Sequence, residues 1–187
     1  MKKVFWLLAI TFLPMAASAE EGRVSEDVIM EDVGEGIFFY NIGKWSVKGL
    51  SAKVKKYDIA IASLKSDNFP DISLSVSCSD EYPRAWFSHK SNNYWRNFGE
   101  TDNKTIIRLP FRFDDRKEIS VTLTGGLSLR IRDADRFIDK IFERSSLIVN
   151  FSAVFRNADG FHNVSFDLRH ARQATERVFE KCNMPMP

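Results

Sequence analysis

Residues 72–79 read Ile-Ser-Leu-Ser-Val-Ser-Cys-Ser, so apolar side chains and serines alternate strictly along the chain. Successive side chains of a β-strand point to opposite faces of the sheet, and this stretch therefore predicts a half-buried strand with serines on its polar face. Cys78 falls on the apolar face of that strand. The pattern is typical of an antiparallel sheet with one face in the core and the other in water.

The same alternation recurs in both directions from this strand. It is clear in residues 107–113, 119–124, 127–132 and 147–155, and weaker in 36–42, 45–51 and 58–64. Gly125-Gly126 separates two such runs and predicts a two-residue hairpin turn. Asn157-Ala-Asp-Gly160 predicts a longer hairpin loop that leads into a strand at 163–168.

Two segments change to a helical period. Ala134–Phe142 carries apolar residues at helical spacing behind Asp133, a suitable N-cap. The last helix is expected within residues 169–182, with Asp167 or a neighbour as its cap and Cys182 at the end of its buried stripe. We therefore predict a mainly β (α+β) fold: an antiparallel β-sandwich-like or strongly curved sheet, with two short helices covering an end or edge.

The first 19 residues have the features of a secretory signal peptide. Lys2 and Lys3 precede an apolar run over residues 4–13, and Ala17-Ser-Ala19 is a small-residue cleavage site. The apolar run is shorter than the ~20 residues that a transmembrane helix needs, and no later stretch is apolar enough to span a bilayer. We expect export to an oxidising compartment and no transmembrane segment after cleavage.

Charge divides the remaining chain into two parts. Residues 20–35 hold seven acidic residues and one Arg, and are expected to be a flexible acidic arm. Residues 36–187 suit a single β-rich domain with a sizeable core, since the chain contains 16 Phe and four Trp. This body is only weakly basic, so no nucleic-acid partner is expected.

Cys78 and Cys182 are the chain's two cysteines. A lone pair of thiols in an exported protein usually forms a disulfide. Both cysteines lie on predicted core faces, so the bond would tie the C-terminal helix to a core strand.

The order of these motifs suggests a family. Trp45-Ser-Val opens a strand, Leu74-Ser-Val-Ser-Cys78 ends in a cysteine, and Ser165-Phe-Asp-Leu168 leads into a helix that closes on Cys182. This order resembles that of the VasI/TagO-like periplasmic proteins associated with type VI secretion, over about residues 44–182. The resemblance implies a β-rich module with an accessory or binding role and no established reaction. Arg169-His170 departs from the Gly-Leu that is usual in that family after Phe-Asp-Leu.

No catalytic or metal site is recognisable in the sequence. His89, His162 and His170 lack metal-ligand spacing, and both cysteines are expected to be bonded. There is no phosphate-binding loop and no nucleophile elbow, so neither an enzyme activity nor a cofactor is predicted. Asp114 and Asp115 are neighbours on a strand end, where adjacent side chains diverge, and we interpret them as a charged turn.

Two groups of residues are candidates for partner binding. In residues 85–99, Trp86, Tyr94, Trp95 and Arg96 stand among polar side chains, a mixture that recognition surfaces favour. The alternative is that Trp86 continues a strand while the later aromatics plug the core under a loop.

The second group is a series of arginines on predicted strands. Arg108, Arg112, Arg130 and Arg132 lie on the polar sides of neighbouring strands and could form one basic face for an anionic partner. The alternative is an ordinary solvated polar face.

The leading functional hypothesis is a non-enzymatic binding or accessory protein of the periplasm of a Gram-negative bacterium, serving a type VI secretion system. Its partner would be another periplasmic or envelope protein, or a peptidoglycan-related ligand. The alternative hypothesis is a periplasmic inhibitor of a lysozyme-like hydrolase or toxin, with the aromatic segment as the plugging loop.

Overall fold

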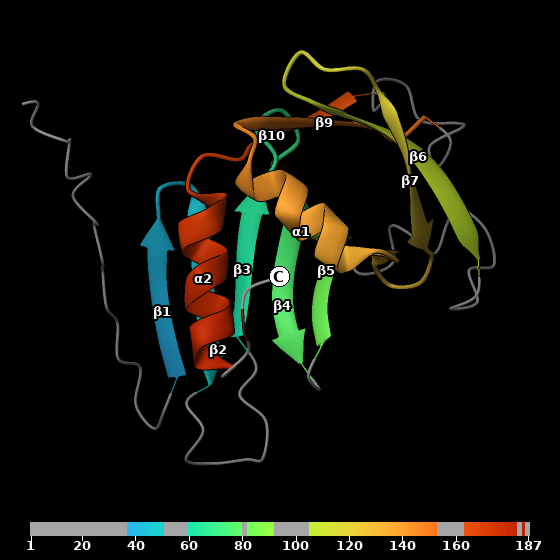
Figure 1. Cartoon of the computed structure of the whole chain (residues 1–187). Coiled ribbons are helices and arrows are strands. Elements are labelled where there is room, and N and C mark those ends of the chain that lie inside the picture. Colours follow the sequence, from blue (N-terminus) through green and yellow to red (C-terminus); the bar gives the residue numbers. More distant parts are fainter. Residues whose placement is uncertain are drawn as a thin grey trace, which may run out of the picture.

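The computed structural model describes residues 37–50, 60–79, 82–91, 105–152, 163–182 and 185. The predicted signal peptide, the acidic arm and the 157–160 hairpin loop lie outside these residues. Within them, the chain forms a curled ten-stranded antiparallel sheet and two helices (Figure 1). The predicted fold class is therefore confirmed.

The bounds of the elements follow the alternation seen in the sequence. The strands are β1 (Ile37–Ile42), β2 (Trp45–Leu50), β3 (Ala60–Lys65), β4 (Ile72–Ser79), β5 (Tyr82–His89), β6 (Ile106–Phe113), β7 (Ile119–Thr124), β8 (Leu129–Ile131), β9 (Ser146–Asn150) and β10 (Asn163–Asp167). The helices are α1 (Ala134–Phe142) and α2 (Ala171–Lys181).

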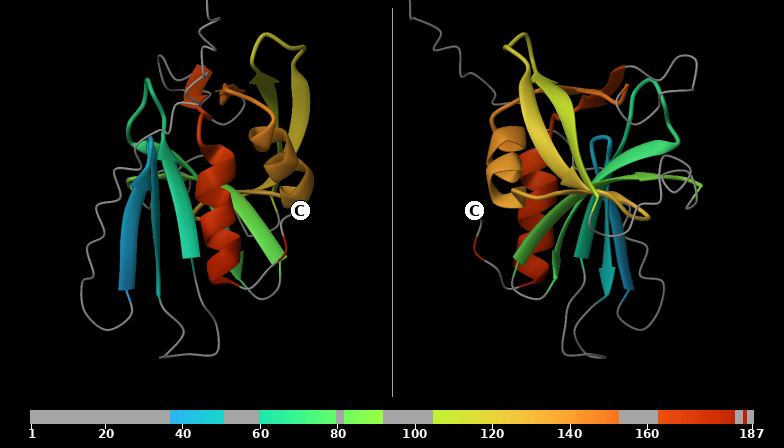
Figure 2. Two further views of the ribbon diagram at one scale, coloured as in Figure 1. Left: turned by 60° about the vertical axis from the view of Figure 1, so that its left-hand side comes forward. Right: turned by 90° about the vertical axis from the view of Figure 1, so that its right-hand side faces the viewer.

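The strands are ordered β1-β2-β3-β4-β5-β8-β7-β6-β9-β10, and the sheet curls so that its last strands return toward its first half (Figure 2). The turn between β3 and β4 meets β10 at this return. Asn68 Nδ2 donates to the Asn163 carbonyl at 2.8 Å, and the Ser165 backbone N–H donates to Asn68 Oδ1 at 3.0 Å. A side-chain amide thus satisfies backbone groups on the free edge of β10.

The core lies on the inner, concave side of the sheet. Ile72, Leu74, Val76 and Cys78 are fully buried there, as their alternation predicts. α2 packs on β2, β3 and β4, and α1 packs on β5. The helices therefore cover a face of the sheet, whereas the sequence predicted that they cover an end or edge.

A cluster of phenylalanines fills the space where the sheet curls. The ring of Phe87 on β5 lies 5.7 Å from that of Phe111, 5.5 Å from that of Phe151 and 5.6 Å from that of Phe166. Edge-on and tilted aromatic packing of this kind is favourable beyond the burial of area. It joins strands from both halves of the sheet into one core.

Cys78 and Cys182 form the predicted disulfide. Their Cα atoms are 6.2 Å apart, a normal separation for a disulfide. Cys182 is the C-cap of α2, so the bond fixes the end of this helix to the end of β4. The disulfide supports an oxidising environment outside the cytoplasm.

Two local predictions are wrong. Thr124 pairs with Arg130, so the connection after β7 is longer than a two-residue hairpin, and Leu127 in it is 55% exposed. Asp167 is not the cap of α2: the N-cap is His170, in a left-handed conformation with φ 66° and without a side-chain capping bond. The Asp167 carboxylate instead pairs with Lys44 and Arg169.

Candidate functional site

A mixed row of side chains crosses the outer side of the sheet, opposite the helices. Trp86 on β5 lies directly opposite Arg130 on β8, Arg130 opposite Thr124 on β7, and Thr124 opposite Ile106 on β6. Residues directly opposite each other in an antiparallel pair share a face. An indole, a guanidinium, a hydroxyl and an aliphatic side chain therefore stand side by side across four strands.

Three further arginines belong to this side of the sheet. Arg84 is two residues before Trp86 on β5, so the strand period places it on the same face. Arg108 lies opposite Thr122, and Arg112 lies opposite Ile148 on β9. We call the surface formed by Arg84, Trp86, Arg108, Arg112 and Arg130 the arginine face.

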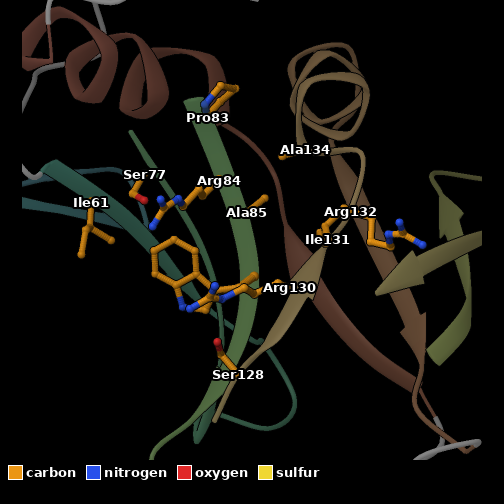
Figure 3. Close-up of a pocket in the computed structure, with 11 residues that line it drawn as sticks. Ile61, Ser77, Pro83, Arg84, Ala85, Ser128, Arg130, Ile131, Arg132 and Ala134 are labelled. Atoms are coloured by element: carbon orange, nitrogen blue, oxygen red, sulfur yellow. The ribbon is translucent and has the colours of Figure 1, made fainter. Parts of the chain in front are cut away.

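Arg132 follows β8, and its backbone N–H donates to the Thr122 carbonyl at 3.1 Å. Its side chain is exposed, and Arg132 lines the same surface hollow as Arg84 and Arg130 (Figure 3). The structure therefore places Arg132 near the other predicted arginines, because the pairing that sets Thr124 opposite Arg130 continues to Thr122 and Arg132.

The strands that carry most of the arginine face contribute no carboxylate to it. β5, β6, β7 and β8 contain no Asp or Glu. Within the described part of the chain, the guanidiniums of Arg108, Arg112 and Arg130 form no ion pair. Four arginines elsewhere each pair with a carboxylate: Arg136, Arg144, Arg169 and Arg177.

A hollow of about 510 Å³ opens on this face where β8 ends and β5 continues alone. We call it the Trp86 hollow. Its lining includes Ile61, Ser77, Arg84, Trp86, Ser128 and Arg130. Figure 3 shows Arg84 and Arg130 extending toward the same side of β5, where Ser77 and Ile61 also lie. The volume is within the range of small-molecule sites.

The serines of β4 form the floor beside this hollow. Ser75 and Ser77 are each 4% exposed although they lie on the outer face. The Ser75 hydroxyl is 2.9 Å from the Ser63 hydroxyl, with which it shares a hydrogen bond. Within the described residues, the Ser77 hydroxyl has no such partner. Ser77 lies between Ile61 and Arg84, its neighbours on the adjacent strands.

Of the aromatic candidates, the structure places Trp86 in the hollow, whereas Tyr94, Trp95 and Arg96 lie outside the described residues. Arg84 and Ser77 also line the hollow but are not among the residues predicted from the sequence. A signal for Arg84 exists, since residues 82–89 place it on the same strand face as Trp86. No local signal points to Ser77, because its place in the hollow depends on the register of β4 and β5.

Asp114 has a structural role at the junction of β6 and β9. Its Oδ1 accepts hydrogen bonds from the backbone N–H and the hydroxyl of both Ser145 and Ser146, at 2.9–3.2 Å. Desolvation raises the pKa of the Asp114 carboxyl, but these four hydrogen bonds outweigh it and the net pKa lies below its ordinary value. An acceptor so fully engaged is a poor general base.

A second charged cluster joins three turns at the top of the sheet. Lys44 Nζ lies 2.8 Å from Asp67 Oδ1 and 3.2 Å from Asp167 Oδ2. Hydrogen bonds from Arg169, the largest cause, and from Lys44 hold the pKa of the Asp167 carboxyl well below its usual range. Desolvation raises this pKa, but by less than the hydrogen bonds lower it. These pairs fasten the β1–β2 and β3–β4 turns to the start of α2.

Neither a metal centre nor a membrane-spanning helix is found within the described ranges. No group of three or more His, Cys, Asp or Glu in them is arranged to hold a metal ion, and no helix in them has the length and hydropathy to cross a bilayer. Comparisons with protein-family models, with curated proteins and with solved structures found no match. The resemblance to VasI/TagO-like proteins therefore stays a prediction.

Proposed function

We propose that this chain is an exported, non-catalytic binding protein whose arginine face receives an anionic partner. The observation that carries the proposal is the grouping of several arginines without an ion pair on one face. Arg108, Arg112 and Arg130 form none within the described residues, and Arg116 and Arg172 elsewhere in these residues also form none. Ion pairs are found off this face, at Arg136, Arg144, Arg169 and Arg177. Four neighbouring strands without a carboxylate produce a positive surface potential that attracts anions.

The spacing of the positive charges favours an extended anionic partner. Neighbouring strands are ~4.8 Å apart, so Arg108 and Arg130, two strands apart, are separated by at least ~10 Å at their Cα atoms. Arg112 lies six residues along β6 from Ile106, which is level with Arg130, so a small anion bound at Arg130 cannot also reach Arg112. A polymer with repeated negative charges, or an acidic protein surface, can contact both.

The Cys78–Cys182 disulfide supports a site of action in an oxidising compartment. The signal-like residues 1–19 support the periplasm as that compartment. The non-catalytic part of the proposal is supported by the sequence, which carries no recognised nucleophile or cofactor motif.

Charge reversal tests the proposed function. The chain from residue 20 onward is applied at low salt to one matrix carrying polyglutamate and another carrying oligogalacturonate. We expect retention on at least one matrix, with elution as salt rises because screening weakens the attraction. Arg108→Glu/Arg130→Glu should abolish retention.

The matched control is Arg136→Glu/Arg177→Glu, which changes the net charge equally but lies on the two helices. Its retention should stay close to that of the unchanged chain. Equal losses in both double variants would show that net charge alone governs retention, and retention on neither matrix by the unchanged chain would exclude the arginine face as an anion-binding surface.

The resemblance described above leads us to propose a partner within the type VI secretion apparatus. Secretion-sheath and baseplate genes beside the gene for this chain would support that assignment. Their absence, together with unaltered secretion after deletion of the gene, would remove the apparatus from the proposal and leave the binding function to be tested on its own.

A further inference from the structure

Trp86 differs from the tryptophan that belongs to the core. Trp45 is fully buried, and its Nε1–H donates to the Arg169 carbonyl at 3.1 Å. Trp86 is only partly buried, and within the described residues its ring contacts no other ring or cation and its indole N–H has no acceptor. A large aromatic surface with an unused hydrogen-bond donor is typical of a ligand contact.

Ser77 supplies a second unused polar group. Its side chain is 4% exposed and lines the hollow, and its hydroxyl has no hydrogen-bond partner in the described part of the chain. The Ser77 hydroxyl is not one of the buried, unsatisfied polar atoms of the described residues, so it is open to solvent and a ligand hydroxyl could form a hydrogen bond with it in place of water. Ser75, equally buried, already shares one with Ser63.

Arg130 brings a positive charge to the same place. It lies directly opposite Trp86, and its side chain extends to the side where Arg84 and Ser77 lie (Figure 3). Among the described residues that line the hollow, none carries a carboxylate. A guanidinium can bind a carboxylate through two parallel hydrogen bonds.

The edge of β5 disfavours an extended peptide as the occupant. A peptide that adds to a sheet edge relies on backbone N–H and C=O groups along that edge. Pro83, which lines the hollow on the part of β5 that continues past β8, has no N–H to donate. The recognition groups that the described residues bring to the hollow are side chains: one aromatic plane, three guanidiniums and two hydroxyls.

We propose that the Trp86 hollow binds one carboxylated pyranose unit of an anionic glycan. The C–H face of the sugar ring packs on the indole of Trp86, whose π-face is electron-rich. The carboxylate binds the Arg130 guanidinium, and a ring hydroxyl bonds with Ser77. This inference rests on the proposed function, since it names the ligand class for the same face.

Titration of the chain from residue 20 onward with defined probes tests the inference by calorimetry. Two probes are acidic sugars: oligogalacturonate carries its carboxylate on the ring, and N-acetylmuramic acid carries it on a lactyl ether. The other two probes are the neutral methyl ester of oligogalacturonate and polyglutamate. We expect one or both acidic sugars to bind at least ten times more tightly than polyglutamate, and the neutral ester to bind at least ten times more weakly than the acid. The tighter of the two acidic sugars identifies where the carboxylate stands on the ring.

Variants separate stacking from charge. Trp86→Ala and Ser77→Ala should remove the preference for the acidic sugar over polyglutamate, and Trp86→Phe should keep part of it. Arg130→Gln should weaken both ligands, whereas Arg177→Gln on α2 should change neither. Circular dichroism checks that each variant is folded.

Each contrary result overturns a defined part of the two proposals. Equal affinity for the acidic sugars and polyglutamate, unchanged by Trp86→Ala, overturns the sugar site and leaves the proposed function standing. Tighter binding of polyglutamate identifies an acidic peptide as the occupant and also overturns it. Binding of the neutral ester as tightly as the acid removes the role of Arg130, and no binding of any probe overturns both proposals.

Discussion

The imidazole of His170 lies directly over the backbone of Gly43. A Cβ at position 43 would stand 2.6 Å from His170 Cδ2, and Gly43 has a φ of +57° in the turn between β1 and β2. The His170 ring is held there by a 2.9 Å hydrogen bond between its Nδ1 and Gln173 Oε1. The start of α2 and the first turn of the sheet therefore depend on a glycine for their close approach.

Gly43→Ala should lower the free energy of unfolding by about 1–3 kcal/mol, because it adds left-handed strain and a steric clash. The clash disappears when the ring is removed, so Gly43→Ala in a His170→Ala background should be less destabilising than in the unchanged chain. Urea unfolding of the four proteins of this double-mutant cycle measures the coupling. Additive effects would show that the imidazole does not press on position 43.

The disulfide should contribute strongly to stability because it closes a long loop. Cys78 and Cys182 are 104 residues apart, and chain-entropy arguments give about 4.7 kcal/mol for a loop of this size, with measured losses of about 2–5 kcal/mol. We expect Cys78→Ala/Cys182→Ala to unfold at lower urea concentration than the oxidised chain. The unchanged chain under a thiol reductant is the control and should match the double variant. Coincident curves for all three samples would be inconsistent with a stabilising bond.

Asp114 should make stability depend on pH in the acid range. Its folded pKa is lowered below the unfolded value, so its contribution is complete above the unfolded pKa and is lost as pH falls through the folded pKa. Asp114→Ala, which leaves the N–H groups of Ser145 and Ser146 without their acceptor, should cost about 2 kcal/mol at pH 7. Asp114→Asn keeps an acceptor oxygen and tolerates the positive φ of this position, so its loss should be smaller.

Unfolding measured at pH 7 and at pH 2.5 distinguishes these effects. The gap in unfolding free energy between the unchanged chain and Asp114→Asn should narrow at the lower pH, because the unfolded chain then binds a proton at Asp114 that the native carboxylate resists. A gap that is constant with pH would show that the charge of Asp114 contributes nothing.

Local alternation could predict which strands exist and which positions share a face, because that information is contained in a few consecutive residues. It correctly predicted that Cys78 and the apolar residues that alternate with serines on β4 are buried. The cap of α2 could not be predicted in this way. Asp167 is the better capping residue by type, but Lys44, 123 positions earlier, and Arg169 engage its carboxylate.

The Trp86 hollow was equally beyond local reasoning. It depends on the pairing of β5 with β8, which places Trp86 opposite Arg130. Two whole strands, β6 and β7, lie between these residues in the sequence. Alternation also states only that Trp86 and Phe87 point to opposite faces. Which of the two faces the core is decided by the side on which the helices pack.

The neighbouring aromatics Trp86 and Phe87 offer a direct test of that arrangement. Phe87 is fully buried against Phe111, Phe151 and Phe166, so Phe87→Ala should destabilise the protein by about 3–5 kcal/mol. Trp86 lies on the outer face without a ring contact in the described residues, so Trp86→Ala should lower stability by about 1 kcal/mol or less. Urea unfolding of the two variants measures both values under the same conditions. If Trp86→Ala lowers the free energy of unfolding as much as Phe87→Ala does, Trp86 is a core residue. Its indole would then not be free to contact a ligand, and the Trp86 hollow could not be a binding site.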